Sequence, residues 1–208
     1  MNKEITWIKN PLAILADNCE GGLVVQGRKI IELVTRGKNP STGIDQIYDA
    51  SESVVLPGLV NTHHHFYQTL TRAYPEALNQ ELFPWLKSLY KVWANIQPEM
   101  HAVATELALA ELLLSGCTTA SDHHYLFPSQ LENAIDIQVE QANKIGMRVV
   151  LTRGSMSLGE KDGGLPPQSV VQTDDQILQD SERLINTYHQ TESGAMIQIA
   201  LAPCSPFS

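Results

Sequence analysis

The sequence has few cysteines, and their arrangement excludes two classes of small protein. The three cysteines, Cys19, Cys117 and Cys204, lie far apart and form no C-x-x-C pair. An odd number of isolated cysteines indicates neither a disulfide framework nor a zinc ribbon. The cysteine usage therefore predicts a reducing compartment, most simply the cytoplasm.

Basic residues are also scarce. The chain carries 14 lysines and arginines against 23 aspartates and glutamates, a formal net charge of −9. Such an acidic chain is not expected to bind nucleic acid or an anionic membrane surface. No apolar run approaches the roughly 20 residues that a bilayer span requires. With 43% hydrophobic residues, the composition predicts a soluble globular protein whose partner is a small molecule.

Two regions differ in pattern, and we expect a domain boundary between residues 57 and 58. Residues 1–57 hold short β-rich pieces at 12–15, 22–25 and 29–34, separated by Asn, Gly and Pro, which predicts a small all-β subdomain. From residue 54 onward, strand-like runs alternate with helical stretches, which is typical of a parallel α/β sheet. The expected strands are 54–62, 118–122, 148–152 and 196–202, and the expected helices are 98–115, 130–145 and 174–188.

The helix at 98–115 shows the clearest pattern. Pro98 suits its first turn and Gly116 a stop. Apolar residues recur at i, i+4, i+7 and i+11, so we expect this stripe to face the core. The stripe consists of Val103, Leu107, Ala110 and Leu114.

The strongest chemical signal is a run of three histidines, His63, His64 and His65, directly after the predicted strand 54–62. Alternate side chains of a strand share one face and lie about 6.6 Å apart at Cα. His63 and His65 are therefore expected to converge on one metal ion while His64 points away. Catalytic groups of a barrel lie at the C-terminal ends of its strands. The alternative is an incidental surface run of histidines.

The stretch VLPGLVNTHHHFYQTLTRA resembles the first barrel strand of the amidohydrolase superfamily, in which an H-x-H pair supplies two ligands to a catalytic zinc or iron. The resemblance continues through ELFPWLKSLYKVWA, AELLLSGCTTASDHHYLFP, LTRGSMSLGEKDGGLPPQSVV and ALAPCSPFS. These stretches are most similar to 8-oxoguanine deaminases, guanine deaminases and triazine hydrolases. The resemblance implies a TIM (β/α)8 barrel, of which this chain holds the first four βα units, preceded by part of a small β-sandwich. It also implies one divalent metal, for which zinc is preferred over iron.

Three pocket residues are carried over from the resemblance. Gln68 matches a glutamine that hydrogen-bonds the heterocycle, which suits an amide because it both donates and accepts; the alternative is an exposed glutamine at a helix start. Trp85 matches an aromatic residue over the pocket, although a helical stripe of leucines explains it equally well. Arg153, at the end of the strand 148–152, either faces the pocket or pairs with an acid.

Two further candidates lie at the ends of other strands. His123 stands in the order S-D-H, which the resemblance includes. It either acts beside the metal or the substrate, or is a packed, hydrogen-bonded histidine without a functional role. Cys204 stands in PCSPFS where guanine deaminases resemble P-R-F-S, which disfavours unmodified guanine as substrate. The H-x-E and P-C-x-x-C pattern of cytidine-type zinc deaminases is absent. His101 and His189 lie on helices and are predicted to have no function.

Hydrolytic deamination needs more groups than these, because a metal-bound water must lose a proton and the leaving nitrogen must gain one. The resemblance assigns those groups to strands five to eight, whereas four strands fill residues 54–208 and a complete barrel takes about 250 residues. We therefore expect an N-terminal half that holds no complete catalytic set, from a protein whose full-length form is a homo-oligomer.

Three functions stay open from the sequence. The first is a metal-dependent deaminase of a purine-like heterocycle, similar to 8-oxoguanine deaminase. The second is an amino- or chlorohydrolase of triazines, which nothing in residues 1–208 separates from the first. The third is an inactive fragment that acts as an interaction subunit.

Overall fold

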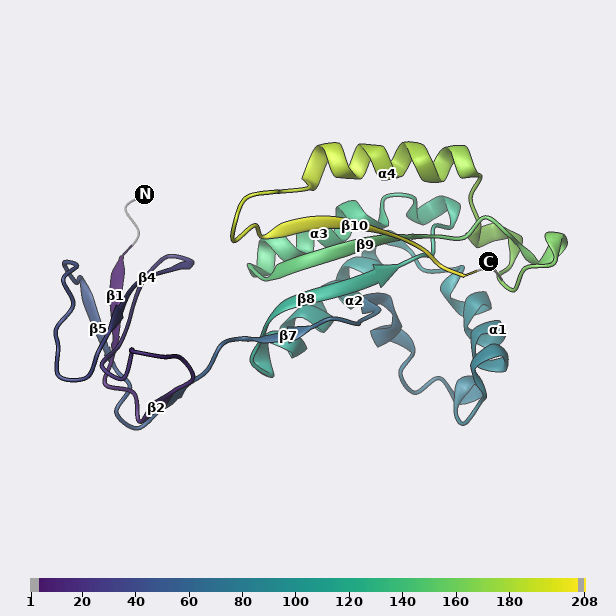
Figure 1. The fold of residues 1–208 in the computed structure, drawn as a ribbon. Helices are drawn as coiled ribbons and strands as arrows, with labels where there is room; N and C mark the ends of the chain where they lie inside the picture. The colour runs from purple at the N-terminus through teal and green to yellow at the C-terminus, as the bar shows by residue number, and fades with distance from the viewer. Residues whose placement is uncertain (1–3, 206–207) are drawn as a thin grey trace. The chain divides into compact units, whose positions relative to one another are not determined.

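The computed structural model describes residues 4–205 and Ser208, and the chain forms two compact units, Met1–Gly58 and Leu59–Ser208 (Figure 1). In the described part of the first unit, a four-stranded sheet has the order β4-β3-β1-β5, and a two-stranded sheet pairs β2 with β6. Trp7, Val24 and Val34 form its small core. The strands are β1 (Ile5–Lys9), β2 (Ala13–Ile14), β3 (Gly22–Gln26), β4 (Lys29–Val34), β5 (Gln46–Asp49) and β6 (Val54–Val55).

The second unit is α/β. Its described residues form a parallel four-stranded sheet in the order β10-β9-β8-β7, and helices connect each strand to the next. This is the partial barrel expected from the sequence, with one difference: three of the four expected βα units are complete, and the described part of the fourth is its strand alone. The strands are β7 (Leu59–Asn61), β8 (Cys117–His124), β9 (Arg148–Ser155) and β10 (Ile197–Pro203), and the connecting helices are α2 (Pro98–Leu114), α3 (Ala134–Ile145) and α4 (Asp174–Tyr188).

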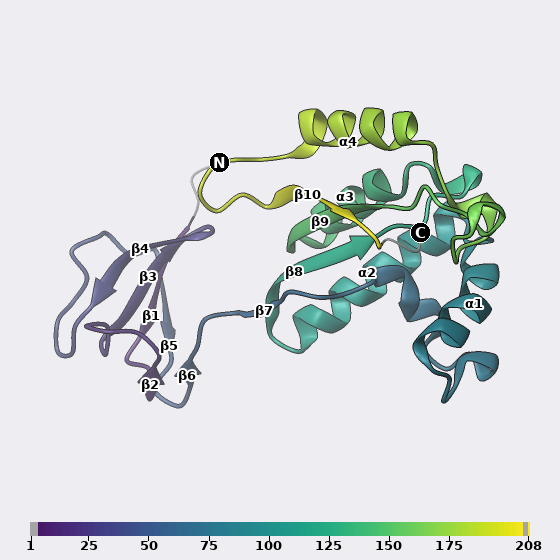
Figure 2. The ribbon, with the colours of Figure 1, turned by 45° about the vertical axis from the view of Figure 1, so that its right-hand side comes forward.

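Shorter elements lie at the ends of the strands, and Figure 2 shows α1 there. Helix α1 (Leu82–Trp93) and two 3-10 turns, η1 (Phe66–Thr71) and η2 (Pro75–Ala77), fill the long connection from β7 to α2. Turn η3 (Ser129–Leu131) follows β8, and turns η4 (Glu160–Asp162) and η5 (Gln168–Val170) follow β9. Among the described residues, no helix has the length and apolar character needed to cross a membrane.

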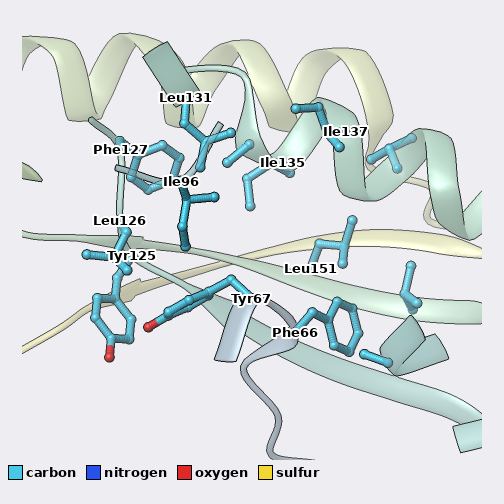
Figure 3. Close-up of a cluster of buried hydrophobic side chains, with 14 of the residues drawn as sticks. Phe66, Tyr67, Ile96, Tyr125, Leu126, Phe127, Leu131, Ile135, Ile137 and Leu151 are labelled. Atoms are coloured by element: carbon cyan, nitrogen blue, oxygen red, sulfur yellow. The ribbon is translucent and has the colours of Figure 1, made fainter. Parts of the chain in front are cut away.

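The core of the second unit lies between the sheet and its helices. Strand β9 contributes Val149 and Leu151, which are fully buried. Figure 3 shows Leu131 and Ile135 reaching down from η3 and α3 toward Leu151, with Phe66 on the other side of the same cluster. Burial of such side chains contributes about 1.5–3 kcal/mol each, so this layer fixes the position of the strand ends.

The strand predicted at 54–62 is in fact two strands, which belong to different units. Val54–Val55 pairs with β2 in the first unit, whereas Leu59–Asn61 pairs with β8 in the second. Pro57 stands between them, and because proline has no N–H it cannot continue a ladder of hydrogen bonds. Strands β1 and β5 were not predicted from the sequence.

The predicted core face of α2 is wrong. Val103 is 60% exposed, Leu107 41% and Leu114 90%. The buried face carries instead His101, Ala104, Thr105, Ala108 and Leu109. Helix α2 is apolar on almost every side, so periodicity alone could not select one stripe. The structure uses the stripe with small side chains, which lets α2 approach η1, α3 and β8 closely.

Candidate active site

The histidine run leaves the sheet at the C-terminal end of β7. His63, His64 and His65 lie just beyond Asn61, in backbone that stays extended at His65 (φ −132°, ψ 90°). Pairing with β8 continues here, because the His123 N–H donates to the His64 carbonyl at 2.9 Å. The ring centroids of His63 and His65 are 5.0 Å apart, and the His64 ring lies near Phe66. The structure thus brings together the two rings that the spacing predicted.

A hydrogen bond fixes which nitrogen of His65 is free. His65 Nδ1 lies 2.7 Å from the carbonyl oxygen of His123. A carbonyl only accepts, so Nδ1 carries the proton and Nε2 presents its lone pair. Burial, the largest cause, lowers the pKa of His65 to about 4, so the ring is neutral near pH 7. A neutral imidazole held through its other nitrogen by a carbonyl is the usual state of a metal-binding histidine.

A pocket of about 560 Å³ lies in front of these rings. Helix α1 supplies an apolar wall that includes Trp85, which also contacts Trp93 edge to face at 5.4 Å. Every site residue predicted from the sequence, except Arg153, lines this pocket: His63, His65, Gln68, Trp85, His123 and Cys204. The pocket is lined as well by Tyr90, Tyr125 and Leu165, for which the sequence predicted no role.

Gln68 lies in η1 at the pocket wall. Its Nε2 donates to the hydroxyl of the fully buried Tyr67 at 3.4 Å. This contact directs the amide nitrogen to the protein and leaves the amide oxygen as the acceptor for a ligand N–H. Cys204, at the end of β10, has its pKa raised by burial, so it presents an uncharged thiol.

His123 is half-buried at the end of β8, with its ring 5.6 Å from that of His65 and 5.2 Å from that of Tyr125. Burial is the largest cause that lowers its pKa, so it is neutral near pH 7. Gly154 on β9 makes room for it, since a Cβ there would lie 2.8 Å from His123 Nε2 and 2.6 Å from Tyr125 Cβ. This role of Gly154 was not predicted from the sequence, although a glycine near a strand end is a sign of such a close approach.

Arg153 does not line this pocket and pairs with an acid, which is the second of the two roles predicted for it. The side chain is buried on the helix side of β9, with its guanidinium stacked on Phe127. Its Nε donates to Asp180 at 3.1 Å and its Nη2 to Gln172 at 2.6 Å. Strand alternation explains this placement, because Arg153 shares its face with the buried Leu151.

His101, which the sequence predicted to have no function, is fully buried on α2. Its ring lies 4.6 Å from that of His124. Burial lowers the pKa of His101 to about 4. His189 accepts from the Ile199 N–H at 3.1 Å at the end of α4, which is a structural contact.

Within residues 4–205 and Ser208, no group of three or more His, Cys, Asp and Glu side chains is placed to bind one metal ion. The converging donors here are the two imidazoles of His63 and His65. Catalytic zinc sites ordinarily have three protein ligands. The donor type therefore fits a zinc-like cation, and these two side chains would supply part of its coordination.

Comparisons with known proteins agree with this geometry. The profile of the amidohydrolase family matches residues 54–208. The chain is 64% identical over 206 residues to an 8-oxoguanine deaminase of Pseudomonas aeruginosa, covering 98% of this chain and 46% of that protein. It is 35% identical over 153 residues to a hydroxydechloroatrazine ethylaminohydrolase of Pseudomonas sp. strain ADP, covering 72% of this chain and 32% of that protein.

Solved structures with the same fold include a triazine hydrolase from Arthrobacter aurescens, with a TM-score of 0.88 and 27% identity over 99% of this chain and 48% of that one. An atrazine chlorohydrolase from Arthrobacter aurescens TC1, complexed with zinc, has a TM-score of 0.85 and 28% identity over 97% of this chain and 47% of that one. The chain thus spans about half the length of these relatives, or less.

Proposed function

Because the chain belongs to the amidohydrolase family, we propose that it supplies the H-x-H part of the active site of a metal-dependent hydrolase that removes an amino group from an oxidised purine. The observation that carries this proposal is the convergence of the rings of His63 and His65, with Nε2 of His65 left free. The 64% identity to an 8-oxoguanine deaminase supports the substrate class.

His63 and His65 would hold one divalent ion. Zinc is the proposal, since imidazole nitrogen suits it and a structural relative was crystallised with zinc. When bound, the metal supplies an activated water for attack on the ring carbon that carries the amino group. The remaining ligand and the acid and base for proton transfer would come from the part of the fold that the relatives have and this chain does not span.

The pocket residues of this chain bind and orient a flat, neutral ring. The amide oxygen of Gln68 would accept a lactam N–H, and Trp85 would cover the ring. The Cys204 thiol adds no charge, which suits an uncharged oxidised purine. His123, neutral and beside His65, would hydrogen-bond the substrate or the attacking water.

The setting of the reaction follows from composition. From the three isolated cysteines we propose a cytoplasmic enzyme, and from the net charge of −9 a small heterocycle as its partner, with neither nucleic acid nor a membrane surface involved.

Zinc binding by this chain, measured by competition with a chromophoric chelator, tests the metal site. We expect H63A and H65A to abolish binding, because each removes one of two ligands. H64A is the matched control and should keep binding, because the His64 ring lies against Phe66. Equal loss in all three variants would contradict the alternation of the side chains.

Ammonia release tests the activity. The chain would be combined with the C-terminal half of the Pseudomonas aeruginosa relative and supplied with Zn²⁺, then assayed with 8-oxoguanine, isocytosine and hydroxytriazines. Turnover of 8-oxoguanine supports the proposal. A triazine hydrolase is the second candidate because of the structural likeness to that group, and turnover restricted to triazines would favour it. A stable complex of the two halves without any hydrolysis would instead indicate an interaction subunit.

A further inference from the structure

A carboxylate is buried directly behind the histidine run. Asp122 of β8 is fully buried, and each of its oxygens accepts one short hydrogen bond. Oδ1 accepts from the backbone N–H of Phe66 at 2.6 Å, and Oδ2 accepts from Nε2 of Gln138 on α3 at 2.6 Å. The two donors lie 56 and 16 residues away in the sequence, so the carboxylate joins three distant segments.

Phe66 is the residue directly after His65, so this bond acts on the backbone that carries the ring. Two more bonds join the same short segments: His123 N–H to His64 O at 2.9 Å, and His65 Nδ1 to His123 O at 2.7 Å. Residues 64, 65 and 66 are thus each tied to residue 122 or 123. The direction of His65 Nε2 depends on this set of bonds.

Holding a backbone amide with a buried carboxylate costs folding free energy, because the charged group loses its hydration. Burial raises the pKa of Asp122 to about 7, against the opposing effect of its two hydrogen bonds. Gln138 is also fully buried, and its Oε1 has no hydrogen-bond partner in the described part of the chain. Two buried polar side chains with an unsatisfied oxygen cost stability that an apolar pair would not, which indicates a role other than packing.

We propose that Asp122 and Gln138 are positioning residues, which act through the Phe66 N–H to hold the His65 imidazole in the orientation that binds metal. The inference rests on the proposed metal site, in which His65 is a ligand. Gln138 fixes the carboxylate, the carboxylate fixes the start of η1, and η1 fixes the imidazole. Helix α3 is thereby linked to the site although none of its residues reaches the pocket.

The test measures two properties of this chain, its affinity for Zn²⁺ by chelator competition and the protonation of the His65 ring nitrogens by ¹⁵N NMR without metal. D122L removes both hydrogen bonds and is expected to weaken zinc binding about 10- to 100-fold, the usual effect of losing such a support. The Nδ1–H form of His65 should become mixed with the Nε2–H form. D122N should keep zinc affinity within about threefold of the wild type and keep the Nδ1–H form of His65. Its Oδ1 still accepts from the Phe66 N–H, and its amide nitrogen can donate to Oε1 of Gln138 once the Gln138 amide group rotates.

Two further variants separate positioning from stability. Q138L removes one of the two bonds, at a residue remote from the pocket, and should weaken zinc binding in the same direction as D122L. D180N breaks the buried Arg153–Asp180 pair, so it should lower stability while leaving zinc affinity and the His65 spectrum unchanged.

The outcomes distinguish this inference from the proposed function. If the wild-type chain binds no zinc, the proposed metal site fails, and the metal-free His65 spectrum still tests the positioning. If the wild type binds zinc and folded D122L and Q138L bind it equally well, the positioning role is overturned. If D122L does not fold, Q138L decides instead. Wild-type zinc affinity and a wild-type His65 spectrum in Q138L overturn the positioning role. A loss of zinc affinity in D180N as large as that in Q138L also overturns it.

Discussion

Acid should destabilise this protein through His101, and the size of the effect follows from its burial. The side chain is fully buried on α2 against His124, and burial lowers its pKa from 6.5 to about 4. In the unfolded chain the same imidazole gains a proton near pH 6.5. Between these two values the unfolded state therefore binds one more proton than the folded state.

The sign follows from linkage. Above pH 6.5 His101 is neutral in both states and contributes no pH dependence. As the pH falls from 6.5 to 4, the free energy of unfolding decreases by about 1.4 kcal/mol per pH unit from this group. The loss is about 2 kcal/mol at pH 5 and approaches about 3.4 kcal/mol below pH 4.

Urea unfolding of the wild type and H101L at pH 7.5, 6.0 and 5.0 measures this contribution. H101L removes the titrating group, so its stability should fall less steeply with acid. The gap between the two pH dependences should reach about 2 kcal/mol at pH 5. L109A, which truncates another fully buried side chain of α2, is the control, and its curve should run parallel to that of the wild type. If H101L also ran parallel to the wild type, the burial argument would be refuted.

Two other substitutions test the placement of residues around the pocket. G154A should lower the free energy of unfolding by about 1–3 kcal/mol and shift the ring resonances of His123, because the new Cβ would lie 2.8 Å from its Nε2; unchanged resonances would show that the ring does not lie there. D180A should cost about 3–5 kcal/mol in urea unfolding, because it leaves the Arg153 guanidinium buried without its acid. Zinc affinity should be unaffected by D180A, because neither Arg153 nor Asp180 lines the pocket, and a parallel loss of affinity would show that metal binding follows overall stability.

The strands and helices of the second unit could be predicted from the sequence because their signals are local. Helix α4 begins with Thr173, which forms a capping box with Gln176, and α3 ends at Gly146 in the left-handed conformation. The strands of the first unit were harder to predict, because β1 pairs with β5 in parallel across about 40 residues. No local pattern specifies such a pairing.

The same contrast between local and distant signals applies to the residues of the candidate site. The spacing of His63 and His65 predicted that their rings converge, since that depends only on extended backbone. The direction of Arg153 could not be read from its position at a strand end, because alternation places it against α4 and the acid it pairs with lies 27 residues away. Gly154 and Asp122 were missed for a related reason: each acts on a histidine of another segment.

The bonds between the H-x-H segment and β8 bear on how the metal site forms. His65 is oriented by a carbonyl of β8, and the backbone after it by a carboxylate of β8. Strands β7 and β8 are neighbours in the sheet, so the two proposed metal donors are placed by the first βα unit and the strand that follows it. A metal site of this kind does not need a closed barrel to acquire its first two ligands. In the proposed function, the rest of the barrel would complete the coordination and the proton transfers, whereas the imidazole pair is already held in place by its neighbouring strand.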